Sequence, residues 1–367
     1  MTEKIFDYMS HYGYEKVLLF QNEDVGLRAV LAIHSTVLGP AAGGCRFWTY
    51  ASDLDAMEDA MRLARGMTYK YAAAGVNLGG AKVVVIGDPK RKNREMLFRA
   101  LGRFINNLRG EYLTGEDVGT TLQDMDYMRM ETPYVITLSK ASGGAGPIGG
   151  ATAFGVLQAM KACAQETWGV GANLQGRKIV VQGLGAVGYP MVEYLVKEGA
   201  AVTIADIDAQ KVAQVKNDFG VKTMDARDIF SADADIYCPC ALGGVVNDET
   251  LEQFRVKIIC GSANNQLRAE KHGDELTRRG ILYAPDYIAN AGGTVFDTDR
   301  LWGGVNVERG MNKVSKIYER MKQVIDISKS QNIPTYLAAD HIAEERIAQA
   351  RAIKRIGGYN QSAPLTL

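Results

Sequence analysis

The stretch 178–206 constrains the fold more than any other part of the sequence. An apolar run there, KIVVQ (178–182), leads into GLGAVG (183–188), which matches the GxGxxG pattern and opens a helical stretch. A second apolar run, 201–205, ends at Asp206. The fingerprint of a dinucleotide-binding βαβ unit consists of a strand, a glycine-rich turn, a helix and a second strand that ends at an acidic residue. This part of the chain is therefore predicted to be a Rossmann-type, doubly wound α/β domain.

Each position of the glycine-rich turn has its own task in such a unit. Gly183 makes the tight turn, Gly185 lets the backbone approach a pyrophosphate, and Gly188 lets the helix pack closely on the strand. Ala186 and Val187 lie in the same turn, where the helix N-terminus would face the phosphates.

Asp206 predicts which dinucleotide is bound. Its carboxylate would accept hydrogen bonds from the adenosine ribose hydroxyls and would repel a 2′-phosphate, so NAD is favoured over NADP. Asp208 is the competing carboxylate. The alternative to both is a glycine-rich turn that binds no nucleotide.

The rest of the chain predicts two α/β domains. Alternating strands and helices continue to about residue 283, which indicates a parallel sheet, whereas the first third mixes β-rich runs (25–36, 82–86) with helical patterns. The glycine-rich stretch 142–150 marks a boundary, and Pro334 breaks the C-terminal helical region. We expect a mixed-sheet substrate-binding domain (1–140 plus 333–367), an NAD-binding domain (141–332) and a cleft between them.

Composition excludes several other classes of protein. Lys+Arg and Asp+Glu both number 42, so no broad phosphate-neutralising surface, and hence no nucleic-acid partner, is expected. No apolar run reaches the roughly 18 residues of a membrane span, and the start lacks a secretory signal pattern. The 5 cysteines are scattered, which favours reduced thiols in the cytoplasm, and none of the 4 histidines pairs with another at metal-ligand spacing, so no metal is expected.

Two lysines and one aspartate are candidate catalytic or binding groups. Lys70 lies near the end of a predicted helix, and Lys82 follows two glycines at the opening of an apolar strand. A lysine in a dry site can lose its proton and act as a base. Two solvated surface lysines are an equally good interpretation, and Asp117, in a glycine-flanked polar loop, is ambiguous in the same way.

Six segments, in order along the chain, resemble the Glu/Leu/Phe/Val amino-acid dehydrogenase family. They are LGPAAGGCRFWTY (38–50), RGMTYKYAAAGVNLGGAK (65–82), TGEDVGT (114–120), CALGGVVND (240–248), GSANNQL (261–267) and YAPDYIANAGG (283–293). The likeness runs from about residue 6 to about residue 347 and is greatest to the leucine-specific members.

The resemblance implies a reaction and residue roles. Members oxidatively deaminate an L-amino acid to the 2-oxo acid and ammonia with NAD, in two domains that close over a cleft, and they form homo-oligomers such as dimers or octamers. Lys82 would be the general base, Asp117 would shuttle protons with it, and Lys70 would bind the substrate carboxylate. Further substrate contacts are implied for Gly43, Gly44, Met67, Asn264 and Asn290, and further cofactor contacts for Cys240, Ala241 and Asn264.

Four positions depart from the pattern of the leucine-specific members. Ala42 replaces a leucine, or the lysine of glutamate-specific members, and Gly115 replaces an alanine, which together suggest a roomier side-chain pocket. Thr294 and Asp297 stand where valines are usual. We expect a hydrophobic, leucine-type substrate. Two alternatives stay open: an aromatic or long, basic side chain (Phe, Trp, Lys or Arg), and an inactive nucleotide-binding sensor.

Overall fold

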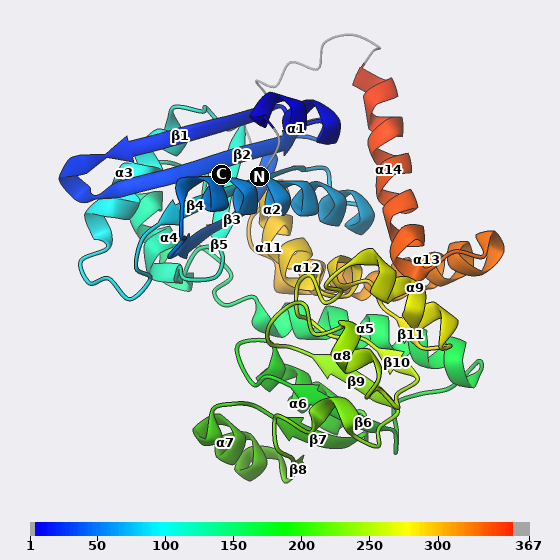
Figure 1. Cartoon of the computed structure of the whole chain (residues 1–367). Coiled ribbons are helices and arrows are strands. Elements are labelled where there is room, and N and C mark those ends of the chain that lie inside the picture. The colour runs from blue at the N-terminus through cyan, green and yellow to red at the C-terminus, as the bar shows by residue number, and fades with distance from the viewer. Residues whose placement is uncertain (1–3, 355–367) are drawn as a thin grey trace. The chain divides into compact units, whose positions relative to one another are not determined.

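The computed structural model describes residues 4–354, which form two compact units (Figure 1). Within the described residues, the first unit comprises 4–147, 297–307 and 343–354, and the second comprises Ile148–Phe296 and Glu308–Ile342. None of the helices within residues 4–354 has the length and apolar character needed to cross a membrane.

The two compact units do not coincide with the expected domain ranges. The second unit begins after residue 141, extends beyond residue 332 and leaves out residues 297–307. The first half of the last helix belongs to the second unit, where the Thr335 hydroxyl donates to the Tyr283 carbonyl at 2.6 Å. Residues 297–307 belong to the first unit, where Arg300 Nε donates to the Ile136 carbonyl at 2.7 Å. Neither contact has a signal in the local sequence. Residues 355–367 of the expected first domain lie outside the described part of the chain.

A mixed sheet forms the centre of the first unit. Its strands are β1 (Lys16–Asn22), β2 (Leu27–Ser35), β3 (Ala41–Trp48), β4 (Gly79–Ile86) and β5 (Tyr112–Glu116). The strand order is β1-β2-β4-β3-β5, in which β2 is antiparallel to both of its neighbours, β1 and β4, and β4, β3 and β5 are parallel. The carboxyl ends of three strands therefore meet at one edge of the sheet.

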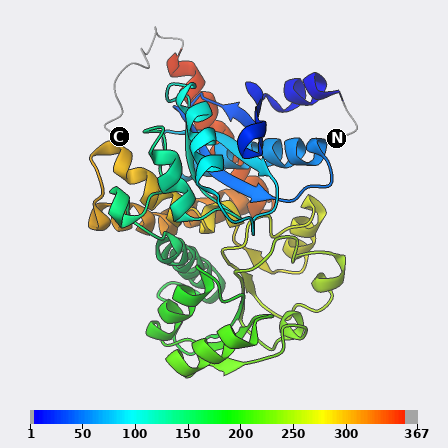
Figure 2. The same ribbon diagram turned by 90° about the vertical axis from the view of Figure 1, so that its left-hand side faces the viewer.

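Helices cover both faces of this sheet. The helices assigned wholly to the first unit are α1 (Ile5–Tyr12), α2 (Asp53–Ala74), α3 (Glu95–Asn106) and α4 (Leu122–Arg129). Helix α2 packs across β2 and β4, an arrangement visible from two sides in Figures 1 and 2. Helix α2 begins after Ser52, a residue type favoured at this position, whose hydroxyl accepts a hydrogen bond from the Asp55 amide at 3.1 Å.

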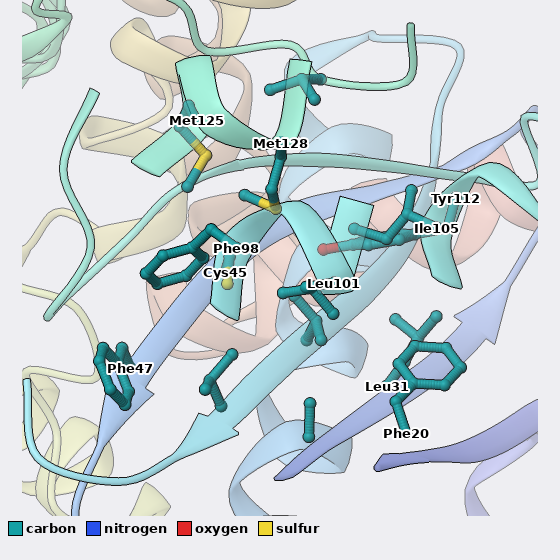
Figure 3. Close-up of a cluster of buried hydrophobic side chains, with 14 of the residues drawn as sticks. Phe20, Leu31, Cys45, Phe47, Phe98, Leu101, Ile105, Tyr112, Met125 and Met128 are labelled. Atoms are coloured by element: carbon teal, nitrogen blue, oxygen red, sulfur yellow. The ribbon is translucent and has the colours of Figure 1, made fainter. Parts of the chain in front are cut away.

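The main core of the first unit lies between the sheet and helices α3 and α4. Figure 3 shows Phe98, Leu101 and Ile105 of α3 between the methionines of α4 and the side chains of the strands. Alternate residues of β4 point into this core, including Val83 and Val85. The intervening residues of β4 face α2, so one strand is buried on both faces.

The second unit confirms the doubly wound expectation. Its parallel strands follow the order β11-β10-β9-β6-β7-β8, which is the strand order of a dinucleotide-binding fold. The strands are β6 (Lys178–Gln182), β7 (Ala201–Ala205), β8 (Lys222–Thr223), β9 (Ile236–Pro239), β10 (Ile258–Ile259) and β11 (Leu282–Tyr283).

The helices of the second half of the chain alternate with these strands and then run consecutively. They are α5 (Gly149–Trp168), α6 (Gly188–Lys197), α7 (Ala209–Phe219), α8 (Asp248–Leu251), α9 (Glu270–Arg278), α10 (Asp286–Ala289), α11 (Gly292–Thr298), α12 (Val307–Ser315), α13 (Ile317–Gln331) and α14 (Thr335–Lys354). Short 3-10 turns lie at Glu23–Val25 (η1), Lys140–Ser142 (η2), Ile229–Ser231 (η3) and Asp299–Trp302 (η4).

The core between α3 and the sheet generates a stability prediction. Leu101→Ala should lower the free energy of unfolding by about 2–5 kcal/mol, because it leaves a cavity among fully buried neighbours. Met96→Ala on the same helix is the control, since Met96 is 52% exposed and a surface change costs within about 0.5 kcal/mol. Urea unfolding of both variants measures the difference, and equal losses would contradict the assigned core.

Candidate active site

Lys82 is a buried lysine in the middle of an apolar strand. It is 4% exposed, and it lies on the face of β4 that is turned toward α2. Two neighbours fix that orientation: a Cβ on Gly80 would meet the Thr68 amide nitrogen of α2 at 2.1 Å, and Val84 packs against the alanines of α2. The ammonium Nζ lies 3.1 Å from Asp117 Oδ1. Of the two interpretations that the spacing left open, the structure therefore has the buried one.

Asp117 follows directly after β5 and is shared by two cations. Its other oxygen, Oδ2, accepts a hydrogen bond from Arg46 Nε at 2.9 Å. Arg46 also donates to Asp59 Oδ2 of α2 at 2.9 Å, and the Tyr50 hydroxyl donates to the same oxygen at 2.6 Å. The result is a continuous chain of charge-assisted hydrogen bonds from Lys82 to Tyr50.

The charge of Asp117 is held by this chain. Burial disfavours the ionised carboxyl, but the Lys82 ammonium and the Arg46 guanidinium outweigh burial and hold the pKa of Asp117 below its ordinary value. The pKa of Asp59 is lowered in the same way: burial opposes ionisation, and the Tyr50 hydroxyl and Arg46 favour it more strongly.

Two neighbouring glycines of β3 have no room for a side chain, and Gly44 is the one that leaves the space in which Lys82 and Asp117 meet. A Cβ on Gly44 would lie 2.7 Å from Asp117 Cβ and 3.1 Å from Lys82 Nζ, so a side chain there would displace the pair. A Cβ on Gly43 would lie 1.8 Å from the Ala81 carbonyl oxygen. The buried Tyr112 hydroxyl donates to the Gly43 carbonyl at 2.9 Å and fixes this segment of backbone.

Helix α2 brings Met67 and Lys70 to the same sheet face. Met67 Cγ lies 3.4 Å from the position of a Cβ on Gly43. Lys70 is half-buried and lies three residues further along α2, so the two side chains share one face of the helix.

Three of the four positions that depart from the leucine-type pattern belong to the first unit. Ala42 is fully buried in an apolar cluster with Tyr71, Leu78, Leu113, Ile136 and Leu301. A Cβ on Gly115 would lie 2.7 Å from Thr137 Oγ1, and the same hydroxyl donates to Asp297 Oδ2 at 2.7 Å. Thr294 lies in the second unit, half-buried on α11.

The GLGAVG turn has the conformation that its sequence predicts. Gly183 has φ +90°, a region that favours glycine, and a Cβ on Gly188 would lie 1.9 Å from the Gly183 carbonyl oxygen. A Cβ on Gly185 would meet nothing within 4 Å, so the backbone is open there. Ala186 is exposed and Val187 is half-buried, immediately before α6 begins at Gly188.

The structure distinguishes the two competing carboxylates after β7. Asp208 caps helix α7, where its Oδ1 accepts hydrogen bonds from the amides of Gln210 and Lys211 at 3.0 and 3.4 Å. The Asp206 carboxylate is bound instead by the Leu184 amide of the glycine turn, at 2.7 Å, and by the Asp208 amide at 2.8 Å. Asp206 is therefore the carboxylate that lies against the turn.

Two further segments meet at the carboxyl edge of the second sheet. The Cys240 amide donates to the Gln182 carbonyl at 2.7 Å, and Ala241 Cβ lies 2.7 Å from the position of a Cβ on Gly183. Asn290 is buried, and its Nδ2 donates to Asn264 Oδ1 at 2.8 Å. These predicted cofactor contacts and the predicted substrate contact Asn290 therefore lie along one sheet edge, where parallel α/β sheets bind ligands.

Sequence reasoning missed three residues that the site depends on. Arg46 and Asp59 carry the charge chain outward from Asp117, and Thr137 binds Asp297. An arginine and an aspartate among apolar neighbours, within β3 and α2, were a detectable signal. Thr137 had none, because its partner lies far away in the sequence.

Fold and site together define a two-domain dehydrogenase, with a nucleotide-type parallel sheet in one unit and a buried Lys–Asp pair in the other. Two family models match the chain: the Glu/Leu/Phe/Val dehydrogenase dimerisation domain over residues 15–134, and the Glutamate/Leucine/Phenylalanine/Valine dehydrogenase domain over residues 143–355. The chain belongs to the Glu/Leu/Phe/Val dehydrogenase family and is an amino-acid dehydrogenase.

Relatives with different substrates are similar over nearly the whole chain. A leucine dehydrogenase from Geobacillus stearothermophilus is 50% identical over 95% of this chain and 94% of its own length. A phenylalanine dehydrogenase from Thermoactinomyces intermedius is 43% identical over 96% of each chain. The crystal structure of L-tryptophan dehydrogenase from Nostoc punctiforme is 37% identical, covers 95% of this chain and 100% of its own, and has a TM-score of 0.81.

The buried ion pair generates a second stability prediction. Asp117→Asn should cost about 3–5 kcal/mol of unfolding free energy at neutral pH, because it leaves the Lys82 charge buried without its partner. Asp53→Asn, which breaks the exposed Arg28–Asp53 pair, is the matched control and should cost about 1 kcal/mol or less.

The contribution of Asp117 to the free energy of unfolding should decrease as the pH falls. Since the pKa of Asp117 is lower in the folded state, its stabilisation is present above the unfolded-state value of about 3.9 and is lost as pH falls through the folded-state value. The gap between wild type and Asp117→Asn should therefore shrink in acid. If the difference in unfolding free energy between wild type and Asp117→Asn stays constant down to that acidic pH, the ion pair is contradicted.

Proposed function

We propose that this protein catalyses the NAD-dependent oxidative deamination of a hydrophobic L-amino acid to its 2-oxo acid and ammonia, reversibly. The observation that carries the proposal is the Lys82–Asp117 pair beside Gly44, in which Lys82 comes from the middle of β4 and Asp117 follows β5. A buried amine that can exchange a proton with a neighbouring carboxylate is what this reaction needs, because a water molecule must be activated to hydrolyse the imino acid.

Lys82 acts as the general base through Nζ. In its neutral form it takes a proton from the attacking water, and Asp117, 3.1 Å away, accepts or returns that proton. Arg46 supports the cycle because it also binds the Asp117 carboxylate. Asp117 therefore keeps a cationic partner when Lys82 loses its charge.

The substrate carboxylate is bound from helix α2. Lys70 supplies the positive charge, and the Gly43–Gly44 backbone and Met67 form the neighbouring surface. Binding the carboxylate at one point and the amino group near Lys82 orients the Cα–H bond, which fixes the reacting geometry without further chemistry from the protein.

The second unit is suited to a nicotinamide dinucleotide, and NAD is the proposed form. The open backbone at Gly185 leaves room for a pyrophosphate, and the amides at the start of α6 suit its charge. The Asp206 oxygens retain lone pairs for ribose hydroxyls, and their charge disfavours a 2′-phosphate. A bound nicotinamide would supply the hydride acceptor that the oxidation of the substrate needs. Asn264 is the proposed contact at that end, and Asn290, which donates a hydrogen bond to it, is a proposed substrate contact.

The leucine-type side chain is supported by the 50% identity to leucine dehydrogenases. A second candidate is the same reaction on a larger side chain, such as Phe, Trp, Lys or Arg. It is favoured by Ala42 and Gly115, which are smaller than the residues that the leucine-specific pattern has at these positions, and by the polar Thr137 hydroxyl beside Gly115.

Assembly and location complete the proposal. A homo-oligomer, a dimer or an octamer, is supported by the dimerisation domain matched at residues 15–134 and by the exposed apolar residues Phe6 and Leu19 on α1 and β1. The 5 free cysteines support the reducing cytoplasm.

Replacing the proposed base tests the mechanism. Lys82→Ala should lower kcat with L-leucine by about 10²–10⁴-fold while NAD still binds, because general-base catalysis contributes that much. Lys90→Ala, an exposed lysine in the loop after β4, is the control and should keep its rate. Formation of reduced nicotinamide measures turnover, and an alanine variant with more than a tenth of the wild-type kcat would exclude the role.

Cofactor choice is tested at Asp206. The wild type should prefer NAD, and Asp206→Ala should narrow the ratio of kcat/KM for NAD over NADP, because both the ribose contact and the charge repulsion are lost. Asp208→Ala removes only a helix cap, so its ratio should match the wild type. Equal use of the two cofactors by the wild type would refute the role of Asp206.

A further inference from the structure

Asp297 is a buried carboxylate with one oxygen that accepts no hydrogen bond. The residue is 3% exposed and lies near the end of α11. Its Oδ2 accepts the hydrogen bond from Thr137 Oγ1, whereas Oδ1 is buried without a partner. Leaving a polar atom in this state costs about 1–3 kcal/mol, and more when it is charged, so the arrangement calls for an explanation.

The charged groups around Asp297 do not supply that partner. The charge of Arg300 acts on Asp297, but its Nε and Nη2 donate to the backbone carbonyls of Ile136 and Val135. Glu116 of β5 adds a second negative charge, and burial together with the Asp297 charge raises the pKa of Tyr71 on α2. Negative charge therefore exceeds the positive charge that is free to bind it.

The same environment makes the ionisation of Asp297 sensitive near neutral pH. Burial raises the pKa of Asp297 to about 7; the Thr137 hydrogen bond and Arg300 oppose that rise, and Glu116 adds to it. A donor that reached Oδ1 would favour the ionised form.

Small residues connect Asp297 to the Lys82–Asp117 pair. Gly115, whose Cβ would meet Thr137 Oγ1 at 2.7 Å, is paired across the sheet with Gly44, whose Cβ would meet Lys82 Nζ at 3.1 Å. Ala42 lies two residues before Gly44 on the same strand. The wall between the proposed base and Asp297 thus carries almost no side chains of its own.

We propose that Asp297 is a specificity-determining residue whose free Oδ1 accepts a hydrogen bond from the end of the substrate side chain. The inference rests on the proposed amino-acid dehydrogenase reaction and refines its substrate class. The preferred side chain is longer than that of leucine and ends in a donor. The excess of negative charge favours a cationic end, such as an ammonium or guanidinium, over an indole N–H or a phenol O–H.

A matched pair of substrates isolates this contact. L-lysine and L-norleucine have the same four-carbon side chain, and only lysine carries the terminal ammonium. The full-length enzyme is assayed with both, and with Leu, Val, Phe, Trp, Tyr and Arg, with NAD and NADP each supplied. We expect kcat/KM to be at least about tenfold higher for lysine than for norleucine, since a site built to bind a donor rejects the analogue that lacks it.

Variants of Asp297 test whether the carboxylate causes the preference. Asp297→Asn keeps the volume and removes the charge, and it should lower the lysine-to-norleucine ratio at least about tenfold without lowering kcat/KM for norleucine. Asp297→Val should favour aliphatic substrates outright. Asp53→Asn, an exposed aspartate of the same unit, should keep the wild-type ratio. A preference for Trp or Tyr that is lost in Asp297→Asn would also support the proposal, with a neutral donor.

The pH profile of the wild type gives a test that needs no variant to fold. Because only ionised Asp297 accepts the donor fully, the lysine-to-norleucine ratio should rise as pH increases through about 7. A flat ratio, or a ranking led by Leu and Val that Asp297→Val leaves unchanged, would overturn the proposal while leaving the dehydrogenase reaction intact. Failure to oxidise any amino acid would instead overturn the proposed function.

Discussion

The first unit depends on a charge pair that an apolar sheet has to accommodate. Removing two charges from water costs several kcal/mol for each ion, and a buried pair offsets that cost only when its remaining hydrogen bonds are satisfied. The remaining hydrogen bonds are satisfied here by a chain that leads from Asp117 to α2. It consists of Arg46, Asp59 and Tyr50. The pair also needs space. Gly44 has no side chain that would displace Lys82 and Asp117, and Gly43 has none that would collide with the neighbouring backbone of β4.

Asp117 and Asp297, both in this unit, have opposite electrostatic environments. Asp117 lies between an ammonium and a guanidinium, which hold its pKa low as long as Lys82 carries its charge. Asp297 has a single hydroxyl donor and a second carboxyl in its neighbourhood, and its pKa rises to about 7. The first arrangement suits a group that works with a base in every turnover. The second suits a group whose missing partner arrives with the substrate.

The binding features of the second unit do not depend on a buried charge pair of this kind. Its glycine turn, the cap of α7 and the Asp206 contacts are made by residues near one another along β6, β7 and their connections. Local geometry dominates there, since a tight turn, a helix N-terminus and a strand end are each specified by a few consecutive residues. The fingerprint was therefore readable without any knowledge of the first unit.

The sequence by itself determined the elements with short-range signals: the doubly wound sheet, the start of α2 at Ser52 and the break at Pro334 before α14. It did not predict β3, because AAGGCRFW has too little side chain to show a strand period, or α5, whose glycine- and alanine-rich start resembles a loop. Spacing alone also left Lys82 open between a buried and a solvated lysine. Only the tertiary structure brought Arg46 to Asp117 and Thr137 to Asp297, because contacts between distant residues depend on how strands and helices pack and leave no periodic trace in the chain.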